Sequence, residues 1–182
     1  LDLSRLKAIK ATLGDVTLND VVLGLCAETL SRYLDKSNAT TERSLVAMTP
    51  ISVRSSSLRK ATGNQMSAML LDLATMLALS ARLYSELQIA QRYQPVFNLP
   101  ITNVPGPQVP LYLQGSRLVR QFNSAPLFDS MGLVIVAVSY QGSLTINFTL
   151  CPDVVADGDS LPELLENSLK SISKEARRLK NE

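Results

Sequence analysis

The amino-acid sequence predicts an α/β domain in which a mixed β-sheet is covered by helices. Apolar residues recur at helical spacing near both ends of the chain, which predicts helices there. Two segments with short Gln-Gly turns in the second half predict β-hairpins. Of the 182 residues, 46% are hydrophobic and 19% are charged, so the chain has enough apolar material to bury a core.

Two helices are expected before residue 37. The first covers Asp2–Leu13, where leucine and isoleucine recur at helical spacing, and a glycine follows it. The second begins after Thr17 and runs to about Asp35, and Asp20 stands where it completes a capping box with Thr17. Its stretch Val21–Ala27 is apolar on nearly all sides, so we expect this part of the helix to be buried.

The middle of the chain predicts strands, a polar loop and a helix. The expected elements are strands over Leu45–Val53, Gln65–Leu73 and Val96–Val104, a loop over Arg54–Asn64 and a helix over Met76–Tyr93. Pro50 moves the first strand toward an edge or a bulge. A rigid turn, Pro105-Gly106-Pro107, follows the last strand.

Two hairpins follow, and in each a glycine can take the positive φ of a tight turn. Their strands are Leu111–Leu113 with Arg117–Val119 around Gln114-Gly115, and Leu133–Tyr140 with Leu144–Leu150 around Gln141-Gly142. The strand Leu133–Tyr140 is apolar on both faces over most of its length. We therefore expect it to lie in the centre of the sheet with both faces covered.

A final amphipathic helix is expected after residue 160. Ser160 and Glu163 form the pattern of a capping box, with Pro162 in the first turn. The apolar stripe of this helix consists of Leu161, Leu165, Leu169, Ile172, Ala176 and Leu179. A stripe of this kind predicts that one side of the helix packs on the sheet or on the other helices.

The composition excludes several classes of function. The chain has 18 basic and 16 acidic residues, 5% aromatics and no tryptophan, which argues against a nucleic-acid partner. It has no histidine, so a Ser-His-Asp or Cys-His arrangement within the chain is excluded. Cys26 and Cys151 are isolated, so no metal site is expected, and Cys26 is expected to be a small buried apolar residue. The longest apolar run, Leu133–Val138, is too short to span a bilayer.

Four segments together resemble motifs of one family, the bacterial wax ester synthase/diacylglycerol acyltransferases, in their C-terminal domain. They are the Asn-Asp pair in Thr17–Leu23, the Pro-Ile-Ser-Val-Arg run in Thr49–Arg54, the Asn-Val-Pro-Gly-Pro run in Asn98–Pro107 and the Ser-Tyr-Gln-Gly-Ser-Leu run in Ser139–Leu144. The third motif is the most specific, and all four occur in the order of the family. The resemblance covers nearly the whole chain.

The sequence also departs from the family pattern. Thr102 stands where the family usually has serine, and Pro100 replaces a plain apolar strand residue. The stretch Ala74–Tyr93 is shorter than the helical segment that the family has between the second and third motifs. The His-His-x-x-x-Asp-Gly motif of the family lies in its N-terminal domain and does not occur in this chain.

The resemblance implies one half of a coenzyme-A-dependent, chloramphenicol-acetyltransferase-like two-domain fold. Residues 1–182 would be the C-terminal domain, with the catalytic histidine on an N-terminal domain outside this chain. That histidine would act as general base on a long-chain alcohol or diacylglycerol, which attacks acyl-CoA to give wax esters, triacylglycerol or both. Acyl-CoA is then a cosubstrate, no bound cofactor is expected, and this domain alone would be inactive.

The two isolated cysteines, Cys26 and Cys151, fit a reduced, intracellular setting, so a cytoplasmic protein is expected. Peripheral contact with the inner membrane or with lipid inclusions stays open.

Two residues at the start of the second helix are candidate supporting residues at the interface between the domains. Asp20 is explained by its part in the capping box, which we favour over direct chemistry. Asn19 is harder to explain in this way, because a side-chain amide in the first turn of a buried helix needs partners. We expect Asn19 to form a hydrogen bond across the domain interface and to position the catalytic centre.

Two further groups are candidates for contact with coenzyme A. The segment Asn103, Val104, Pro105, Gly106 and Pro107 is expected either to shape the coenzyme entrance, with Gly106 permitting close backbone approach, or to be a rigid turn after a strand. Arg54, Arg59 and Lys60 are most simply a solvated loop, and the alternative is contact with the phosphates of coenzyme A. An oxyanion role for Ser139 is a remote alternative to packing at the end of its hairpin.

Two other classes of function remain open at this point. One is a non-catalytic acyl-binding or interaction module that keeps the fold. The other is the matching half of a condensation-type domain, in which a carrier protein takes the place of coenzyme A. The acceptor preference, the acyl-chain length and the oligomeric state are not encoded in any motif that we identify.

Overall fold

The computed structural model describes residues 1–39, 44–49, 97–127 and 129–181. Nearly all of them belong to one compact unit, made of residues 1–49, 97–127 and 131–182. The loop, strand and helix predicted between Arg54 and Tyr93 lie outside the described residues. So do the second half of the first predicted strand and the basic residues Arg54, Arg59 and Lys60.

Four strands of the described part form one mixed sheet, as predicted. They are β1 (Ala47–Met48), β2 (Leu99–Pro105), β5 (Leu133–Tyr140) and β6 (Ser143–Leu150), in the order β1-β2-β5-β6. The pairs β1–β2 and β2–β5 are parallel, and β5–β6 is antiparallel. A separate hairpin consists of β3 (Tyr112–Leu113) and β4 (Ser116–Arg117).

Both hairpin turns have the predicted geometry. Gln114 and Gly115 have φ of 48° and 81°, and Gln141 and Gly142 have φ of 42° and 78°. Two successive residues with positive φ are the signature of a type I′ turn, whose twist matches that of the flanking strands. The Gln-Gly dipeptides therefore determine where both hairpins close.

Strand β5 is central and buried along its whole length, which confirms the prediction for it. Its side chains alternate between the two faces of the sheet. Leu133, Ile135 and Ala137 belong to the same apolar core as the helices. Val134, Val136 and Val138 are equally buried and face the other way. A strand with two apolar faces is stable only where both are covered.

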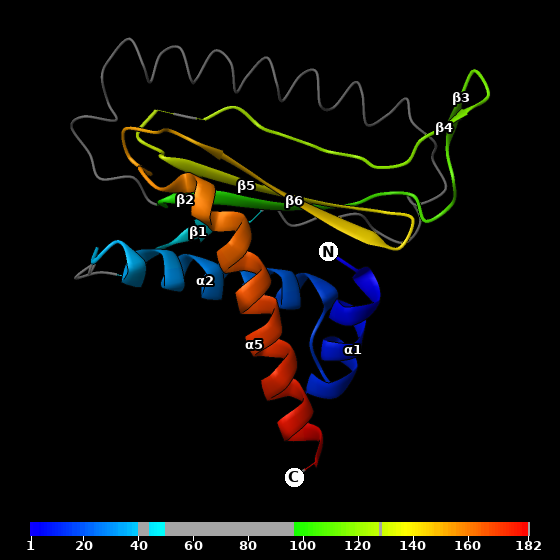
Figure 1. Cartoon of the computed structure of the whole chain (residues 1–182), viewed down its shortest axis with the longest axis horizontal. Coiled ribbons are helices and arrows are strands. Elements are labelled where there is room, and N and C mark those ends of the chain that lie inside the picture. Colours follow the sequence, from blue (N-terminus) through cyan, green and yellow to red (C-terminus); the bar gives the residue numbers. More distant parts are fainter. Residues whose placement is uncertain (40–43, 50–96, 128, 182) are drawn as a thin grey trace. The chain divides into compact units, whose positions relative to one another are not determined.

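Three helices pack on one side of this sheet (Figure 1). They are α1 (Leu3–Leu13), α2 (Leu18–Lys36) and α5 (Leu161–Asn181), which a short 3-10 helix, η2 (Gly158–Ser160), precedes. Their apolar faces meet in one core, which contains Leu6, Ile9, Val22, Leu25, Leu161, Leu165 and Leu169. The predicted cover of helices is therefore present, and α1 and α2 begin and end within one residue of the predicted bounds.

The capping box at the start of α2 is also confirmed. The backbone N–H of Asp20 donates to the Thr17 hydroxyl at 3.1 Å, and the N–H of Thr17 donates to the Asp20 carboxylate at 2.8 Å. These bonds satisfy donors that the first turn of a helix otherwise leaves unpaired. The backbone N–H of Thr17 holds the pKa of the Asp20 carboxylate below its usual value.

Three details of the helix predictions are wrong. In α2, Gly24 and Ala27 are exposed, so the helix buries one face rather than nearly all sides. Both residues are small, and their exposure to water therefore costs little hydrophobic free energy. In α5, the apolar stripe ends at Ala176, because Leu179 lies in the last turns of the helix and is 47% exposed. The hydroxyl of Ser160 donates to the carbonyl of Asp157 within the 3-10 turn, in place of the predicted capping box.

Within the described ranges, no helix is both long and apolar enough to cross a membrane.

Replacement of Thr17 by alanine should lower the free energy of unfolding by about 1 kcal/mol, because the cap loses its side-chain acceptor. Urea unfolding followed by circular dichroism measures this change. Thr12→Ala is the matched control: Thr12 lies in the last turn of α1, and its hydroxyl only donates back to the carbonyl of Ala8, so its loss should cost nothing. A Thr17→Ala protein as stable as the control would contradict the role of the cap.

Asp20→Asn tests the charge in the same cap. The pKa of Asp20 is lower in the folded state, so its carboxylate stabilises the fold above the ordinary carboxylate pKa of about 4. This contribution is lost as the pH falls through the lowered pKa. Urea unfolding should therefore show Asp20→Asn as less stable than the parent at neutral pH, with the difference shrinking below pH about 4. A difference that does not change with pH would contradict this account.

Candidate functional site

The first and third motifs meet through a pair of asparagines. Asn103, on β2, donates from Nδ2 to Oδ1 of Asn19, in the first turn of α2, at 3.2 Å. The two residues are 84 positions apart in the chain, and both are half-buried. Sequence reasoning named each residue but did not pair them. From the sequence we expected a partner for Asn19 across a domain interface. In the structure, the side-chain oxygen of Asn19 has a partner in the same domain. A hydrogen bond of Asn19 across an interface stays a prediction.

The third and fourth motifs meet at Gly106. Its backbone N–H donates to the hydroxyl of Ser139 at 3.2 Å. A Cβ atom at position 106 would lie 2.1 Å from the Ser139 carbonyl oxygen, which no side chain can tolerate. The close neighbour of Gly106 is therefore Ser139 of strand β5, and the predicted shaping of a coenzyme entrance by Gly106 stays a prediction. The packing of two strands by itself explains why this position is glycine.

Gln108 completes this contact and was not identified from the sequence. Its Nε2 donates to the Gly106 carbonyl at 3.0 Å and to the Ser139 hydroxyl at 3.3 Å, and its Oε1 accepts from the Gly142 N–H at 3.0 Å. The N–H of Gln141 donates to the Pro107 carbonyl at 3.2 Å. The only signal in the sequence is its place directly after the Pro-Gly-Pro turn. Residues 105–108 are thus bonded both to Ser139 and to the β5–β6 turn, and we call this segment the loop clamp.

These contacts gather at one edge of the sheet. Strands β2 and β5 are parallel, with Pro105 opposite Ser139, so both end at the same edge. In open α/β sheets, ligands bind outside the carboxyl ends of parallel strands. Val104, Pro105 and Pro107 are exposed there. Asp20 is exposed as well, and its carboxylate is used by the helix cap.

Ser139 is 7% exposed, and its hydroxyl oxygen accepts two hydrogen bonds, from Gly106 and Gln108. These bonds support packing at the end of the hairpin, the role preferred from the sequence. Cys26 lies in the core of α2, and burial raises the pKa of its thiol to about 12. It therefore stays protonated near neutral pH and is no nucleophile, as expected.

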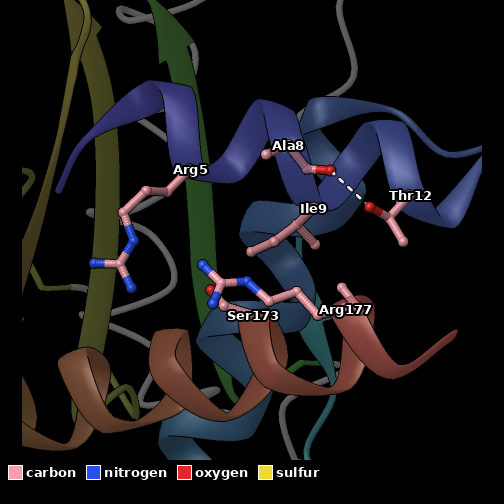
Figure 2. A pocket seen from close by; sticks show the side chains of 7 residues that line it. Arg5, Ala8, Ile9, Thr12, Ser173 and Arg177 are labelled. Carbon is pink, nitrogen blue, oxygen red and sulfur yellow. Dashed lines mark hydrogen bonds between the residues drawn. The ribbon is translucent and has the colours of Figure 1, made fainter. Parts of the chain in front are cut away.

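A small pocket of about 110 Å³ lies elsewhere, between α1 and α5 (Figure 2). The guanidinium groups of Arg5 and Arg177 lie on it, while the hydroxyls of Thr12 and Ser173 donate to carbonyls of their own helices. No motif residue lines this pocket, and its charge does not suit an acyl chain. We therefore do not assign it to the long-chain substrates that the resemblance implies. Phosphate contact by Arg54, Arg59 and Lys60 stays a prediction.

No group of three or more potential metal ligands occurs among the residues that the structure describes.

Comparison with known families gives a direct match. Residues 44–173 match the model of the WS/DGAT C-terminal domain, which is the C-terminal domain of wax ester synthases/diacylglycerol acyltransferases. The matched range includes the second, third and fourth motifs. It extends over most of the sheet and much of α5.

Individual relatives agree with this match. A probable diacylglycerol O-acyltransferase of Mycobacterium tuberculosis H37Rv is 33% identical over 206 positions, which cover 93% of this chain and 45% of that protein. The O-acyltransferase WSD of Acinetobacter baylyi is 29% identical over 204 positions, which cover 93% of this chain and 44% of that protein. Both alignments are longer than the 182 residues of the chain, so they contain gaps where the relatives carry additional residues.

A solved structure shares the fold. The wax ester synthase/diacylglycerol acyltransferase from Marinobacter aquaeolei VT8 superposes with a TM-score of 0.72 at 27% identity, over 97% of this chain and 47% of that protein. The chain thus spans less than half the length of each of these relatives. From the match of the domain model, the shared fold and the motif residues that meet at one edge of the sheet, we conclude that this chain belongs to the wax ester synthase/diacylglycerol acyltransferase family and corresponds to its C-terminal domain.

Proposed function

We propose that this chain is the C-terminal half of an acyl-CoA-dependent O-acyltransferase that forms wax esters, triacylglycerol or both. The acceptor is a long-chain alcohol or a diacylglycerol. The observation that carries the proposal is the hydrogen bond between Asn19 and Asn103, which joins two motifs of the family at the carboxyl edge of the sheet. Family membership and the names of the relatives, which are O-acyltransferases, support the reaction class.

The chemistry needs a group that this chain does not contain. The hydroxyl oxygen of the acceptor attacks the thioester carbonyl carbon, a general base removes the hydroxyl proton, and the coenzyme A thiolate leaves and takes up a proton. A base with a pKa near neutral suits this step best. The chain has no histidine, and the family resemblance supports a histidine base on an N-terminal half that carries the His-His-x-x-x-Asp-Gly motif.

The described residues serve to position the site. The pair Asn19–Asn103 fixes the first turn of α2 against β2, and the loop clamp fixes the exposed Pro105–Pro107 segment beside it. A preorganised wall reduces the cost of orienting the two substrates. Peripheral contact of the complete enzyme with a membrane or a lipid inclusion would bring it to its apolar acceptors.

The decisive experiment uses the full-length gene. The complete protein should transfer radiolabelled palmitate from palmitoyl-CoA to hexadecanol, to dioleoylglycerol or to both. The 182-residue chain alone should give no product, and neither should the complete protein with the first histidines of the upstream motif replaced by alanine.

The other outcomes identify the competing functions. A gene without the upstream histidine motif, together with binding of palmitoyl-CoA but no transfer, would establish a non-catalytic acyl-binding module. Transfer from an acyl carrier protein but not from acyl-CoA would establish a condensation-type domain. Either result would contradict the proposal.

Asn19→Ala and Asn103→Ala should act as positioning variants of the complete enzyme. We expect each to lower kcat more than it changes KM, since neither residue is proposed to touch the reacting atoms. Each single variant removes the same hydrogen bond, which contributes about 1 kcal/mol. The double variant should therefore be little worse than either single variant. Steady-state kinetics with palmitoyl-CoA and thermal unfolding give both readouts.

The matched control for this pair is Asn123→Ala. Asn123 is also half-buried, and its side-chain oxygen accepts from the neighbouring Gln121. Its loss should leave kcat unchanged. Full activity in Asn19→Ala, or additive effects of the two site variants, would contradict the pairing.

Gly106→Ala should separate β2 from β5 at the loop clamp, because the added Cβ meets a backbone carbonyl that cannot move aside cheaply. We expect a loss of stability of at least about 1–3 kcal/mol, the usual cost of overpacking, together with a loss of activity. Gly24→Ala is the control: no atom lies within 4 Å of its Cβ position, and an exposed helical glycine replaced by alanine should stabilise by up to about 1 kcal/mol. Equal melting temperatures for the two variants would contradict this explanation of Gly106.

A further inference from the structure

Two arginines from different helices line the small pocket between α1 and α5 (Figure 2). Arg5 lies in the first turn of α1 and Arg177 near the C-terminal end of α5, and both guanidinium groups reach into the space between the helices. Within the described part of the chain, neither guanidinium forms an ion pair or a hydrogen bond. Two like charges on one pocket repel each other, so packing of the helices does not account for the pair.

The acidic residues closest to this pair in the sequence have other partners. Asp2, the N-cap of α1, accepts from the Ser4 N–H at 2.8 Å. The carboxylate of Glu175 pairs with Arg178 at 2.6 Å. An arginine stays charged at any pH at which the protein is folded. Both guanidinium groups on the pocket therefore keep charged donors that a ligand can use.

The dipole of α1 makes the position of Arg5 unfavourable. The N-terminal end of a helix is positive, so anions are stabilised there and cations at the C-terminal end. This rule accounts for the basic residues in the last turns of α5, but not for Arg5, and the first turn of α1 contains no acidic residue. An anion bound in the pocket would offset both the dipole of α1 and the repulsion between Arg5 and Arg177.

The surroundings of the pocket carry the same sign of charge. Residues 1–13 and 170–181 contain eight of the 18 basic residues and two of the 16 acidic residues of the chain. The rest of the chain contains ten basic and fourteen acidic residues, so its net charge is negative. Helices α1 and α5 pack directly on each other, which brings the two basic segments together. Concentrated charge of this kind raises the local concentration of anions.

The size of the pocket limits what can enter it. Its volume is about 110 Å³, whereas pockets for drug-sized molecules measure roughly 300–1,000 Å³. The small side chains of Ala8 and Ala176 leave this space, and the hydroxyls of Thr12 and Ser173 donate to their own helices. One small charged group fits, and a nucleotide or an acyl chain does not.

We propose that this pocket binds a phosphate group, either free or in the headgroup of an anionic phospholipid. The fork of a guanidinium matches the oxygens of a phosphate. The oxygens of a tetrahedral phosphate point in different directions, so Arg5 and Arg177 bind it from two helices at once. A planar carboxylate is fully used by a single fork. No motif residue lines the pocket, so the site is separate from the proposed acyl transfer.

The test uses the full-length protein with Arg5→Gln and Arg177→Gln. Isothermal titration calorimetry with inorganic phosphate, at constant ionic strength, measures the affinity. Each variant loses one set of charge-assisted hydrogen bonds, so we expect phosphate to bind roughly tenfold more weakly or less tightly still. Phosphate should also raise the melting temperature of the parent more than that of either variant, because a ligand that binds the folded state stabilises it. Far-UV circular dichroism checks that both variants are folded.

Two further variants separate the pocket from the general charge of this surface. Arg178→Gln removes the same charge from the same helix, but Arg178 pairs with Glu175 and does not line the pocket, so this control should bind phosphate like the parent. Ala8→Leu keeps every charge and fills the pocket, so it should weaken phosphate binding as the arginine variants do. Acetate in place of phosphate should bind much more weakly to the parent.

Sedimentation with vesicles distinguishes the two sources of the phosphate group. The parent and Arg178→Gln could sediment with phosphatidylglycerol vesicles while Arg5→Gln, Arg177→Gln and Ala8→Leu do not, which would identify the lipid headgroup. Phosphate binding with equal sedimentation of all five proteins would identify a soluble phosphate. Either result supports the site.

The opposite results would overturn the proposal. They are a parent that binds neither inorganic phosphate nor the vesicles, pocket variants that bind both as tightly as the parent, and losses in Arg178→Gln equal to those in Arg5→Gln and Arg177→Gln. The last result would show that only the net charge of the surface matters. Acetate that binds as tightly as phosphate would overturn the assignment of the ligand. Acyl transfer is not measured in any of these experiments, so their outcome is independent of the proposed function.

Discussion

The close approach of Gly106 to the backbone of Ser139 is the constraint on which the rest of the site depends. A side chain at position 106 would meet the Ser139 carbonyl oxygen, so strands β2 and β5 reach their common end in this register only with glycine there. Once that contact is made, Gln108 bonds to both neighbours and to the β5–β6 turn, and the segment between Pro105 and Gln108 becomes a fixed wall. Each hydrogen bond contributes little free energy, about 1 kcal/mol. The segment is rigid because several of these bonds share the Ser139 hydroxyl and the Gln108 amide.

The same register places Asn103 against α2. Asn103 and Gly106 lie near the end of one strand, and α2 begins where Asn103 can reach its first turn. The capping box of Thr17 and Asp20 fixes where that turn begins. Asn19 therefore faces β2 because the cap starts the helix at this residue and because the core face of α2, with Val22 and Leu25, packs on the sheet. The amide pair thus connects a local signal in the sequence with long-range packing of the sheet.

Under the proposed function, the chain supplies structure around a reaction whose base lies on another half of the protein. Its buried thiol, Cys26, stays protonated, its serine at the site accepts hydrogen bonds from the loop clamp, and it has no histidine. An active site divided in the proposed way would need an interface that aligns the two halves closely, because a misplacement of about 1 Å can cost a large factor in rate. The exposed residues Val104, Pro105 and Pro107 lie at the edge of the sheet where the proposed function would require such an alignment.

The sequence by itself determined the local elements and the family. The cap of α2, the apolar stripes of α1 and α5 and the type I′ turns follow from spacing and from single residues such as Gly115 and Gly142, because each depends on neighbours within a few positions. The central position of β5 follows from the apolar character of both its faces. Its errors at Ala27 and Leu179 concern which part of a helix is covered, and cover depends on distant segments. The error at Ser160 is local, because the hydroxyl donates to Asp157 in the preceding 3-10 turn. The pairing of Asn19 with Asn103, the part played by Gln108 and the neighbour of Gly106 join residues 31 to 84 positions apart in the chain. Only the tertiary structure decided these contacts, because the parallel pairing of β2 with β5 is set by the packing of the whole core and not by any local pattern.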